Sequence, residues 1–324
     1  MVLALVATSS MSATVPAVAA QPQGIVQIVA HQDDDLLFMN PDIATGIKNG
    51  YDTTTVYVTA GEGIPGQTPD TEAYAAERQA GARESYAAMA GVADCKLDSA
   101  EEEEEEEEGC WDADYPVVSN HIVQRFTLRA APHIRLVFLN LPENADYRYL
   151  DGGALTKLRN NPSLVTDTLD MREQAPPQRY NRGDVVDVLS TLMEWYSTTL
   201  VRAQDPAPDL RLRGDHQDHV AAAWFADQAV ARYSAAHQRV LLEHYRDYDI
   251  QQLPANLMST QRDEKQRIIV DHYLPHDQQA SQDDNFIAWE QRQYSRNPRG
   301  TRWMGIDSAG RLHAFAVAGG RLYE

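Results

Sequence analysis

The sequence of 324 residues is poor in cysteine, in positive charge and in long apolar runs. Its two cysteines cannot supply the roughly four ligands of a structural zinc site. The formal net charge is −20, and without the eight glutamates at 101–108 there remain 28 basic against 40 acidic residues. A surface this acidic argues against binding to nucleic acid or to an anionic membrane. The glycines form no GxGxxG fingerprint, so a dinucleotide cofactor is not indicated.

The apolar stretch near the N-terminus, residues 2–7, is too short to span a bilayer. Residues 16–20 then offer small side chains at a cleavable site before Gln21, which is typical of the end of a secretory signal peptide, although a basic first region is missing. We therefore expect residues 1–20 to be a signal peptide and the protein to be secreted. A disordered tail is the alternative.

The cysteines, Cys95 and Cys110, flank the acidic run at 101–108. In an exported protein we expect them to form a disulfide that closes a short loop. A run of like charges normally repels itself into disorder, and cation binding is its functional alternative.

The first candidate site follows an apolar, β-prone run at residues 24–30. This run stops at an imidazole and three successive carboxylates, His31-Gln32-Asp33-Asp34-Asp35. Carboxylates are costly to gather where a buried strand ends, and a cation would offset that cost. His31 and Asp34 offer a nitrogen and an oxygen ligand suited to zinc, and Asp33 would stay free to move a proton. The alternative is a solvated turn in which Asp caps the next helix.

A second cluster lies far downstream, at Gly214-Asp215-His216-Gln217-Asp218-His219, after a short β-like segment at 210–213. Its two histidines are three residues apart, so they share a face in the first turn of a helix. One of them would complete three protein ligands with His31 and Asp34. The fourth position would stay open for water, as in catalytic zinc sites.

These motifs resemble those of a known family, the PIG-L/LmbE-type zinc-dependent N-acetylglucosaminyl deacetylases. The first cluster resembles the family's His-Pro-Asp-Asp-Glu motif, and the second resembles its His-Pro-Asp-His motif. Thr59-Ala60-Gly61-Glu62-Gly63 is similar to a Thr-x-Gly-Glu segment, and Lys265 followed by His272 is similar to a weaker late pattern. The resemblance covers roughly residues 24–275, with Gln32 and Gln217 in place of proline and Asp35 in place of glutamate.

The resemblance implies a bound Zn²⁺, or another divalent metal, held by three ligands: His31, Asp34 and His219. It implies Asp33 as the general base and His216 as the donor to the oxyanion, with Asp218 holding His216 charged and oriented. Glu62 is a candidate for a supporting contact near the site. Four other histidines stand alone in the sequence and are expected to be structural or exposed: His121, His133, His237 and His244.

The order of predicted elements indicates an α/β fold. Apolar or β-branched runs predict strands at 24–30, 53–59, 134–141, 210–213 and 240–245, and periodic segments predict helices at 36–47, 71–90, 185–201, 220–233 and 256–273. This alternation indicates a doubly wound, mostly parallel sheet with helices on both faces. Ligands in such sheets bind beyond the carboxyl ends of strands, where both clusters begin. The irregular segment 142–177 would shape a sugar pocket or form a surface excursion.

The C-terminal segment has no helical pattern. Gly-Arg-Leu recurs at 310–312 and 320–322 with alternating apolar residues between, as in a β hairpin. This is similar to the repeat of lectin-like β-propellers, but one and a half repeats cannot close a propeller. We expect a deacetylase domain at 21–298 and a β segment at 299–324 that begins a longer glycan-binding extension. A local hairpin is the alternative.

The leading interpretation is an exported zinc amidohydrolase that removes the acetyl group from an N-acetylglucosamine-type sugar or glycoconjugate. One alternative keeps the fold and takes a glycosylated secondary metabolite such as a glycopeptide antibiotic. Another is a carbohydrate-binding protein with a structural metal and no catalysis. The spare carboxylate of Asp33 argues against this last alternative, because a structural site would not require it.

Overall fold

The computed structural model describes residues 24–63, 68, 70–92, 95, 109–143, 153–171, 176–209, 211–212, 214–237, 240–277, 279–280, 285–296, 304–306, 311–314, 316–318 and 321–323. The expected signal peptide at 1–20 and the acidic run at 101–108 lie outside the described residues and stay predictions.

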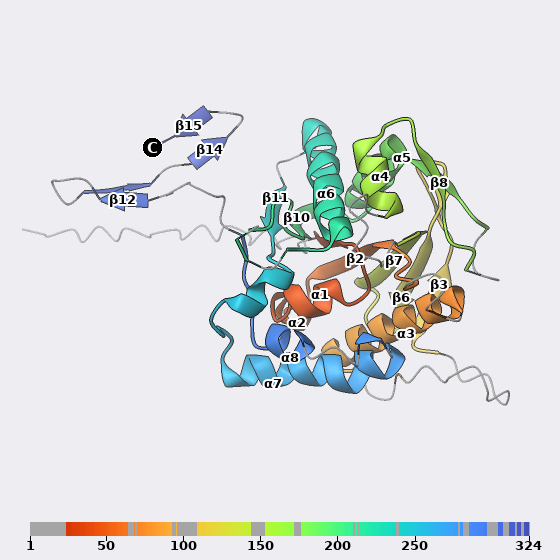
Figure 1. The fold of residues 1–324 in the computed structure, drawn as a ribbon, viewed down its shortest axis with the longest axis horizontal. Helices are drawn as coiled ribbons and strands as arrows, with labels where there is room; N and C mark the ends of the chain where they lie inside the picture. Colours follow the sequence, from red (N-terminus) through yellow and green to blue (C-terminus); the bar gives the residue numbers. More distant parts are fainter. Residues whose placement is uncertain are drawn as a thin grey trace, which may run out of the picture.

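A seven-stranded sheet forms the centre of the protein (Figure 1). In sheet order its strands are β11 (Leu241–His244), β10 (Thr198–Ala203), β1 (Gly24–Val29), β2 (Asp52–Thr59), β7 (Ile134–Leu141), β6 (Gln124–Leu128) and β3 (Trp111–Asp114). The first five are parallel to one another, and β6 and β3 add an antiparallel edge. Strand β1 is buried along its whole length, as expected for a parallel strand covered on both faces. The predicted mostly parallel sheet is confirmed.

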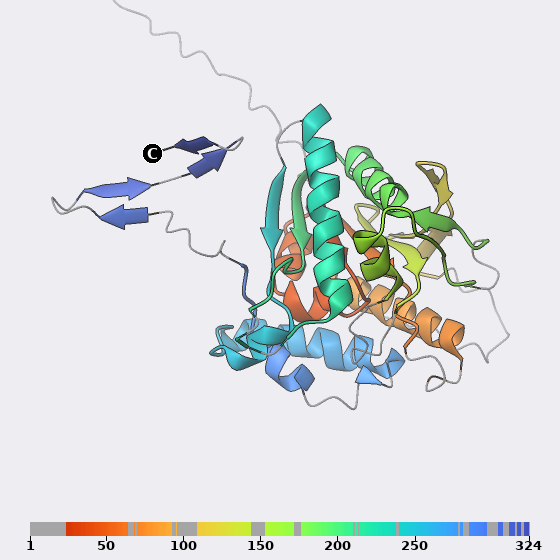
Figure 2. The ribbon, with the colours of Figure 1, turned by 45° about the horizontal axis from the view of Figure 1, so that its top comes forward.

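Helices cover both faces of the sheet (Figure 2). One face carries α4 (Ala154–Asn160), α5 (Arg182–Trp195) and α6 (Gln217–Ala236). The other carries α1 (Asp34–Phe38), α2 (Asp42–Lys48), α3 (Thr71–Met89), α7 (Ser259–Ile268) and α8 (Asn285–Glu290). Each layer buries its own apolar cluster against the sheet, so the core has two halves.

Shorter elements complete the chain. Three helical turns follow β11 and α7: η1 (Tyr248–Gln252), the π-helical η2 (Ile269–Tyr273) and η3 (Leu274–His276). Antiparallel pairs join β4 (Val117–Val118) to β5 (His121–Ile122) and β8 (Val165–Asp167) to β9 (Arg179–Asn181). In the C-terminal segment β12 (Met304–Ile306) pairs with β13 (Leu312–Ala314), and β14 (Ala316–Ala318) pairs with β15 (Arg321–Tyr323). Two short antiparallel pairs thus stand where one hairpin was expected, and the propeller extension stays a prediction.

The predicted helix at 36–47 is wrong in detail, because the structure has two helices there. Helix α1 ends at Phe38 and α2 begins at Asp42, with Pro41 as its N-cap. Proline has no backbone N–H and cannot continue a helical ladder. The break makes α1 a short helix directly behind the first cluster.

The predicted helix at 185–201 is wrong at its C-terminal end, where the structure has a central strand. Helix α5 ends at Trp195, Ser197 turns the chain with a φ of 46°, and β10 then runs between β1 and β11. A buried strand and a buried helix segment both read as apolar runs, so periodicity alone did not separate them.

The expected strand at 210–213 is also wrong. Arg211 and Leu212 lie in a turn, while Leu210 and Arg213 lie outside the described residues. The strand that leads to the second cluster is therefore β10. Within the irregular segment 142–177, the structure places the helix α4 and the strand β8.

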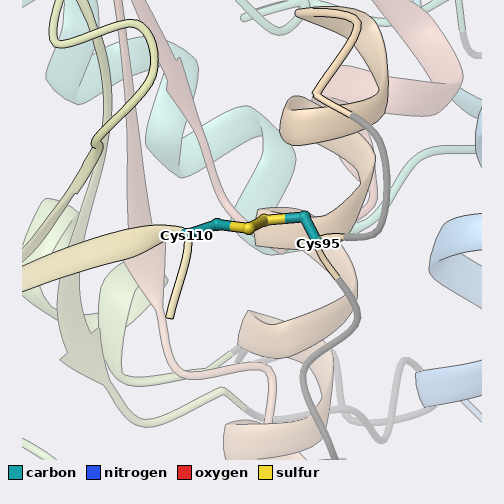
Figure 3. Close-up of a disulfide and its surroundings, with 2 residues drawn as sticks. All are labelled: Cys95 and Cys110. Atoms are coloured by element: carbon teal, nitrogen blue, oxygen red, sulfur yellow. A yellow bond between two sulfur atoms is a disulfide. The ribbon is translucent and has the colours of Figure 1, made fainter. Parts of the chain in front are cut away.

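Cys95 and Cys110 form a disulfide, as predicted (Figure 3). Cys110 immediately precedes β3, and Cys95 is buried among the apolar side chains of the α3 face. Among the described helices, none combines the length and the hydropathy that a membrane span needs.

Candidate active site

Both clusters lie at the carboxyl edge of the parallel strands. His31 follows β1, and His216 lies on the connection that leads from β10 into α6. Strands β1 and β10 are neighbours, yet the chain proceeds from β1 to β2 on one side and from β10 to β11 on the other. In open α/β sheets a reversal of strand order leaves a crevice in which ligands bind. The fold thus brings two distant motifs to one crevice.

The three ligands that the resemblance implies converge. His31 Nδ1 lies 3.2 Å from His219 Nε2 and 3.3 Å from Asp34 Oδ2, and His219 Nε2 lies 3.0 Å from Asp34 Oδ1. All three side chains are buried. The backbone N–H of His31 also donates to Asp34 Oδ2 at 2.6 Å, which fixes this carboxylate in the turn after β1.

These distances fit a small divalent cation. A tetrahedral zinc with bonds of 2.0–2.1 Å needs ligand atoms about 3.3 Å apart. Two imidazole nitrogens and a carboxylate also form a donor set that suits zinc and several other divalent metals. His31, Asp34 and His219 are therefore a candidate metal centre.

The charges around the centre favour a cation. Burial lowers the pKa of His31, but the carboxylates of Glu143 and Asp34 outweigh it and raise this pKa to about 9. Burial likewise lowers the pKa of His219, but Asp34 and Asp215 hold it well above its ordinary value. The neighbouring carboxylates thus favour positive charge on the imidazoles of His31 and His219. A bound metal ion would supply positive charge at the same place.

His219 is oriented from behind by a residue that the sequence did not single out. Its Nδ1 lies 2.7 Å from Asp215 Oδ1, which leaves Nε2 directed at the metal centre. Asp215 and His219 also form a group with Asp247, whose ligand-type atoms all lie within 4.8 Å of one another. A carboxylate on the far nitrogen of a ligating histidine fixes its tautomer and raises its basicity.

The predicted base, Asp33, lies beside the centre, and its ligand-type atom lies within 4.8 Å of those of His31 and Asp34. Its side chain is 15% exposed, and Oδ1 accepts from Arg78 Nη2 at 2.8 Å. Burial raises the pKa of Asp33 to about 6, although Arg78 works in the opposite direction. Asp33 is therefore both held in place and accessible.

Arg78 is a buried hub on α3. Besides Asp33 it donates to Gly61 O at 3.1 Å and, through Nε, to Tyr273 Oη at 2.9 Å. Its Nε also lies 2.9 Å from Asp277 Oδ2, which in turn accepts from Tyr273 Oη at 2.9 Å. The position of Asp33 therefore depends, through Arg78, on Tyr273 and Asp277, which follow helix α7 in the chain. Nothing in the pattern of α3 distinguished Arg78 from other helical arginines.

The Thr-x-Gly-Glu segment and Gln32 form one wall. Gly61 has a φ of 63°, and a Cβ there would lie 2.1 Å from Gln32 Oε1 and 2.5 Å from Arg78 Nη1. Glycine is therefore required by both conformation and space. Gln32, which replaces a proline of the family motif, donates to Thr59 O and Ala60 O at 3.2 and 2.9 Å. The side chain thus ties the first motif to the end of β2.

The second motif differs from expectation at Asp218. His216 Nδ1 accepts the backbone N–H of Asp218 at 3.2 Å, while the Asp218 carboxylate accepts from Thr156 Oγ1 on α4 at 3.2 Å. Asp218 therefore orients His216 through its backbone, and its carboxylate anchors α4. Burial and the neighbouring imidazoles of His31 and His219 lower the pKa of His216 well below its ordinary value. Among the described residues, His216 Nδ1 is thus contacted by the backbone N–H of Asp218 and not by the expected carboxylate, and the lowered pKa runs against the expected charge on the ring.

Glu143 was missed by sequence reasoning. Its Oε1 lies 3.3 Å from His31 Nε2 and 3.9 Å from His216 Nε2, and its Oε2 lies 3.8 Å from Arg78 Nη1. The residue comes two positions after β7 ends, so the rule that ligands bind at carboxyl ends of strands could have found it. Glu62 supports it, because Glu62 Oε2 accepts the backbone N–H of Glu143 at 2.9 Å.

Asp35 points away from the centre into the core. Its Oδ2 accepts from Tyr57 Oη at 3.0 Å and from Tyr86 Oη at 2.6 Å. Burial raises the pKa of Asp35 to about 7, against the effect of these two hydrogen bonds. Asp35 thus anchors the first motif to β2 and α3.

The remaining candidates have structural contacts. Three of the lone histidines bond to backbone carbonyls: His121 to Ser119 O and Arg179 O, His237 to Tyr233 O, and His244 to Gln204 O. His133 is half-buried and precedes β7. Lys265 is buried, and its ammonium donates to the carbonyls of Leu37, Trp289 and Arg292. His272 lies 3.0 Å from Glu84.

The fold and the cluster define a class, namely α/β proteins with a candidate metal centre at the carboxyl edge of a doubly wound sheet. The PIG-L family model, described as GlcNAc-PI de-N-acetylase, matches residues 26–230. This is more than half of the chain, and the chain belongs to the PIG-L family, whose members are deacetylases and therefore hydrolases. The match includes His31, Asp33, Asp34, His216 and His219.

Comparison with curated proteins found no match to this chain. Among solved structures, a teicoplanin deacetylase in a zinc-inhibited form is 14% identical with a TM-score of 0.42, covering 82% of this chain and 89% of that one. N,N'-diacetylchitobiose deacetylase from Pyrococcus horikoshii is 14% identical with a TM-score of 0.43, over 78% and 70%. The 4-carboxy-2-hydroxymuconate hydratase of a Pseudomonas is 14% identical with a TM-score of 0.41, over 80% and 84%. Identities this low transfer no substrate to this chain.

Proposed function

We propose that this protein is a divalent-metal-dependent amidohydrolase that removes the acetyl group from an N-acetylglucosamine-type sugar or glycoconjugate. The observation that carries the proposal is the convergence of His31, Asp34 and His219 within 3.0–3.3 Å of one another, with the Asp33 carboxylate beside them. We assign Asp33 to proton transfer and leave it out of the proposed ligand set. A structural metal site would not need this additional, partly exposed carboxylate. The activity of the PIG-L family agrees with this chemistry.

The proposed metal ligands are His31 Nδ1, a carboxylate oxygen of Asp34 and His219 Nε2, and zinc is the proposed ion. When bound, such a cation acts as a Lewis acid and lowers the pKa of water. Asp215 would keep His219 in the ligating tautomer.

The proton transfers are assigned to Asp33. Its carboxylate accepts a proton from the water that attacks the acetamide carbonyl, and then delivers that proton to the departing sugar nitrogen. The C–N bond breaks, and the products are acetate and the free amine. Arg78 fixes Asp33 Oδ1 at 2.8 Å, so the carboxylate is directed before substrate arrives.

The developing oxyanion is assigned to His216. Because Nδ1 accepts the backbone N–H of Asp218, the proton of the neutral ring lies on Nε2. Nε2 faces the crevice, 3.9 Å from Glu143 Oε1. It can therefore donate a hydrogen bond to the oxyanion without being charged.

The test is amine release from a panel of N-acetylated glycans. We expect free amine in the presence of Zn²⁺, loss of activity with a chelator, and recovery when metal is restored. The proposal fails if no glycan in the panel yields amine with any divalent metal, or if a metal-free preparation is fully active. Full binding of glycans without turnover would instead favour a carbohydrate-binding protein.

We also propose that the protein is secreted, with a signal peptide at 1–20, a deacetylase domain at 21–298 and a separate β segment at 299–324. The short apolar N-terminal stretch and the Cys95–Cys110 disulfide support export. N-terminal sequencing of the protein recovered from culture medium tests this. A mature protein that begins near Gln21 is expected, and retention in the cytosol with residues 1–20 intact would overturn it.

A further inference from the structure

The segment 285–296 lies behind both motifs, and none of the roles assigned above uses it. It contains α8 and the short extended stretch that follows. Helix α8 packs against α1, the helix that begins at Asp34 of the first motif (Figure 1). Beyond α8, Ser295 pairs antiparallel with Tyr245, directly after β11. The whole segment lies outside the residues 26–230 that the family model matches.

A buried lysine fixes the segment to the first motif. The ammonium of Lys265, which is 1% exposed, donates to the carbonyls of three residues: Leu37 on α1, and Trp289 and Arg292 in the segment. An ammonium has three N–H donors, and a buried one is costly unless each finds an acceptor. These three carbonyls satisfy it. The segment therefore has a defined position relative to α1.

A chain of polar contacts leads from the end of the segment to the second motif. Arg296 forms an ion pair with Asp205, two residues after β10, and the two side chains are 12% and 3% exposed. The backbone N–H of Asp205 donates to Asp247 Oδ2 at 3.1 Å. Asp247 lies within the group of ligand-type atoms that includes Asp215 and His219. Asp215 Oδ1 in turn contacts His219 Nδ1 at 2.7 Å.

This chain gathers three buried carboxylates, those of Asp205, Asp215 and Asp247. Buried carboxylates repel one another and are costly unless a cation compensates them. Among the described residues, Asp247 Oδ1 has no hydrogen-bond partner. The guanidinium of Arg296 supplies a permanent positive charge at one end of the group. Without it, repulsion among the carboxylates would displace Asp215 from His219.

An aromatic contact reaches the same histidine from α8. The ring of Trp289 stacks on the ring of Tyr248, with centroids 4.9 Å apart and an interplanar angle of 11°. The ring of Tyr248 meets that of His219 edge to face, also at 4.9 Å. Stacked and edge-to-face arrangements are the favourable geometries for ring pairs. The segment thus limits the tilt of the His219 ring as well as the position of its partner Asp215.

We infer that segment 285–296 positions His219 for metal binding, and that Arg296 and Trp289 are its positioning residues. Arg296 acts through the buried carboxylates, and Trp289 acts through Tyr248. The inference rests on the proposed function in one respect, since it takes His219 as a metal ligand. The affinity of the centre for its cation then depends on residues outside the region that carries the two motifs.

The experiment uses Arg296→Gln, which removes the charge and keeps a polar side chain. Two readouts are taken on the metal-free protein: the Kd for added Co²⁺ from visible absorption, and the low-field proton resonance of His219 Nδ1–H, assigned by its absence in His219→Ala. We expect the Kd to rise about tenfold, at the lower end of the losses seen when a supporting residue is removed. The resonance should shift or disappear. Arg296→Lys keeps the charge and should recover most of both.

Arg292→Gln is the matched control, because the Arg292 guanidinium lies in the same segment and donates to the carbonyls of Leu253 and Ala288. It should lower thermal stability and leave the Kd and the resonance unchanged. An unchanged Kd and resonance in Arg296→Gln, or an equal weakening of Co²⁺ binding in Arg292→Gln, overturns the inference. A resonance that depends on Arg296 in a protein that binds no Co²⁺, or that binds it and releases no amine from any glycan, would retain the positioning role and reject the proposed function.

Discussion

The two motifs at the carboxyl edge hold their reactive side chains in opposite ways. After β1, Asp33 is gripped by a charged and buried partner, Arg78, which is itself bonded to Tyr273 and Asp277. Before α6, His216 Nδ1 accepts the backbone N–H of Asp218. The first side chain is fixed by an ion-pair network that spans distant elements. The second is fixed by the local geometry of a helix start.

This difference matches the proposed tasks. A base that accepts a proton and then delivers it must be ionised when the substrate arrives and must keep its direction, and the guanidinium of Arg78 contributes to both. A hydrogen-bond donor to an oxyanion needs only its tautomer and direction, which an N–H on the opposite ring nitrogen supplies. The carboxylate of Asp218 is thereby released to anchor α4. The two motifs look alike in sequence but differ in which atoms do the orienting.

The largest effect is expected where the two motifs meet, at His219. His219→Ala removes one of three proposed ligands, so metal content measured by elemental analysis should fall from about one per chain to near zero. Loss of affinity should exceed the 10–100-fold typical of removing a supporting residue. His237→Ala, at the other end of α6, is the control and should keep its metal. Full occupancy in His219→Ala would reject this ligand set.

The next largest effect is expected at Asp33, the side chain that Arg78 holds in place. Asp33→Asn keeps size and polarity but cannot accept a proton, so kcat should fall by about 10²–10⁴-fold. Metal content should be unchanged, because Asp33 is outside the proposed ligand set. Asp112→Asn, on the exposed edge strand β3, is the control. If Asp33→Asn emptied the site, Asp33 would be a ligand; if it kept full activity, the assignment of the base would be wrong.

A smaller loss in kcat is expected at His216, the side chain that is fixed by the start of α6. His216→Ala removes the proposed donor to the oxyanion, and kcat should fall by about 10²–10³-fold with metal retained. The double variant with Asp33→Asn should lose less than the product of the single losses, because both groups act on one transition state. Strictly multiplicative losses would show that the two residues act in separate steps.

The smallest effect is expected at Asp277, which contacts Arg78 and so supports the contact between Arg78 and Asp33. Asp277→Asn weakens the hold on Arg78, which lies 2.9 Å from Asp277 Oδ2, and we expect a loss in kcat of about tenfold with KM nearly unchanged. Asp277→Glu should recover part of the loss. A variant that changed KM and thermal stability but not kcat would show that Asp277 only supports the fold.

Much of the fold of this protein could be predicted from short stretches of its amino-acid sequence. The alternation of apolar runs and periodic segments predicted the parallel sheet, since strands buried on both faces read as continuous apolar runs. The same property concealed β10, because a buried run is ambiguous between strand and helix. Pro41 marked the break between α1 and α2, and its missing N–H would have been sufficient to predict it.

The sequence by itself determined which residues end β1 and begin α6, and therefore which imidazoles and carboxylates reach the carboxyl edge. Only the tertiary structure decided their partners. His31 and His219 are 188 residues apart and meet because β1 and β10 are neighbours in the sheet. Arg78, Glu143 and Asp215 come from α3, the end of β7 and the loop before α6. Their contacts depend on how helices pack across a sheet, and no local pattern records that packing.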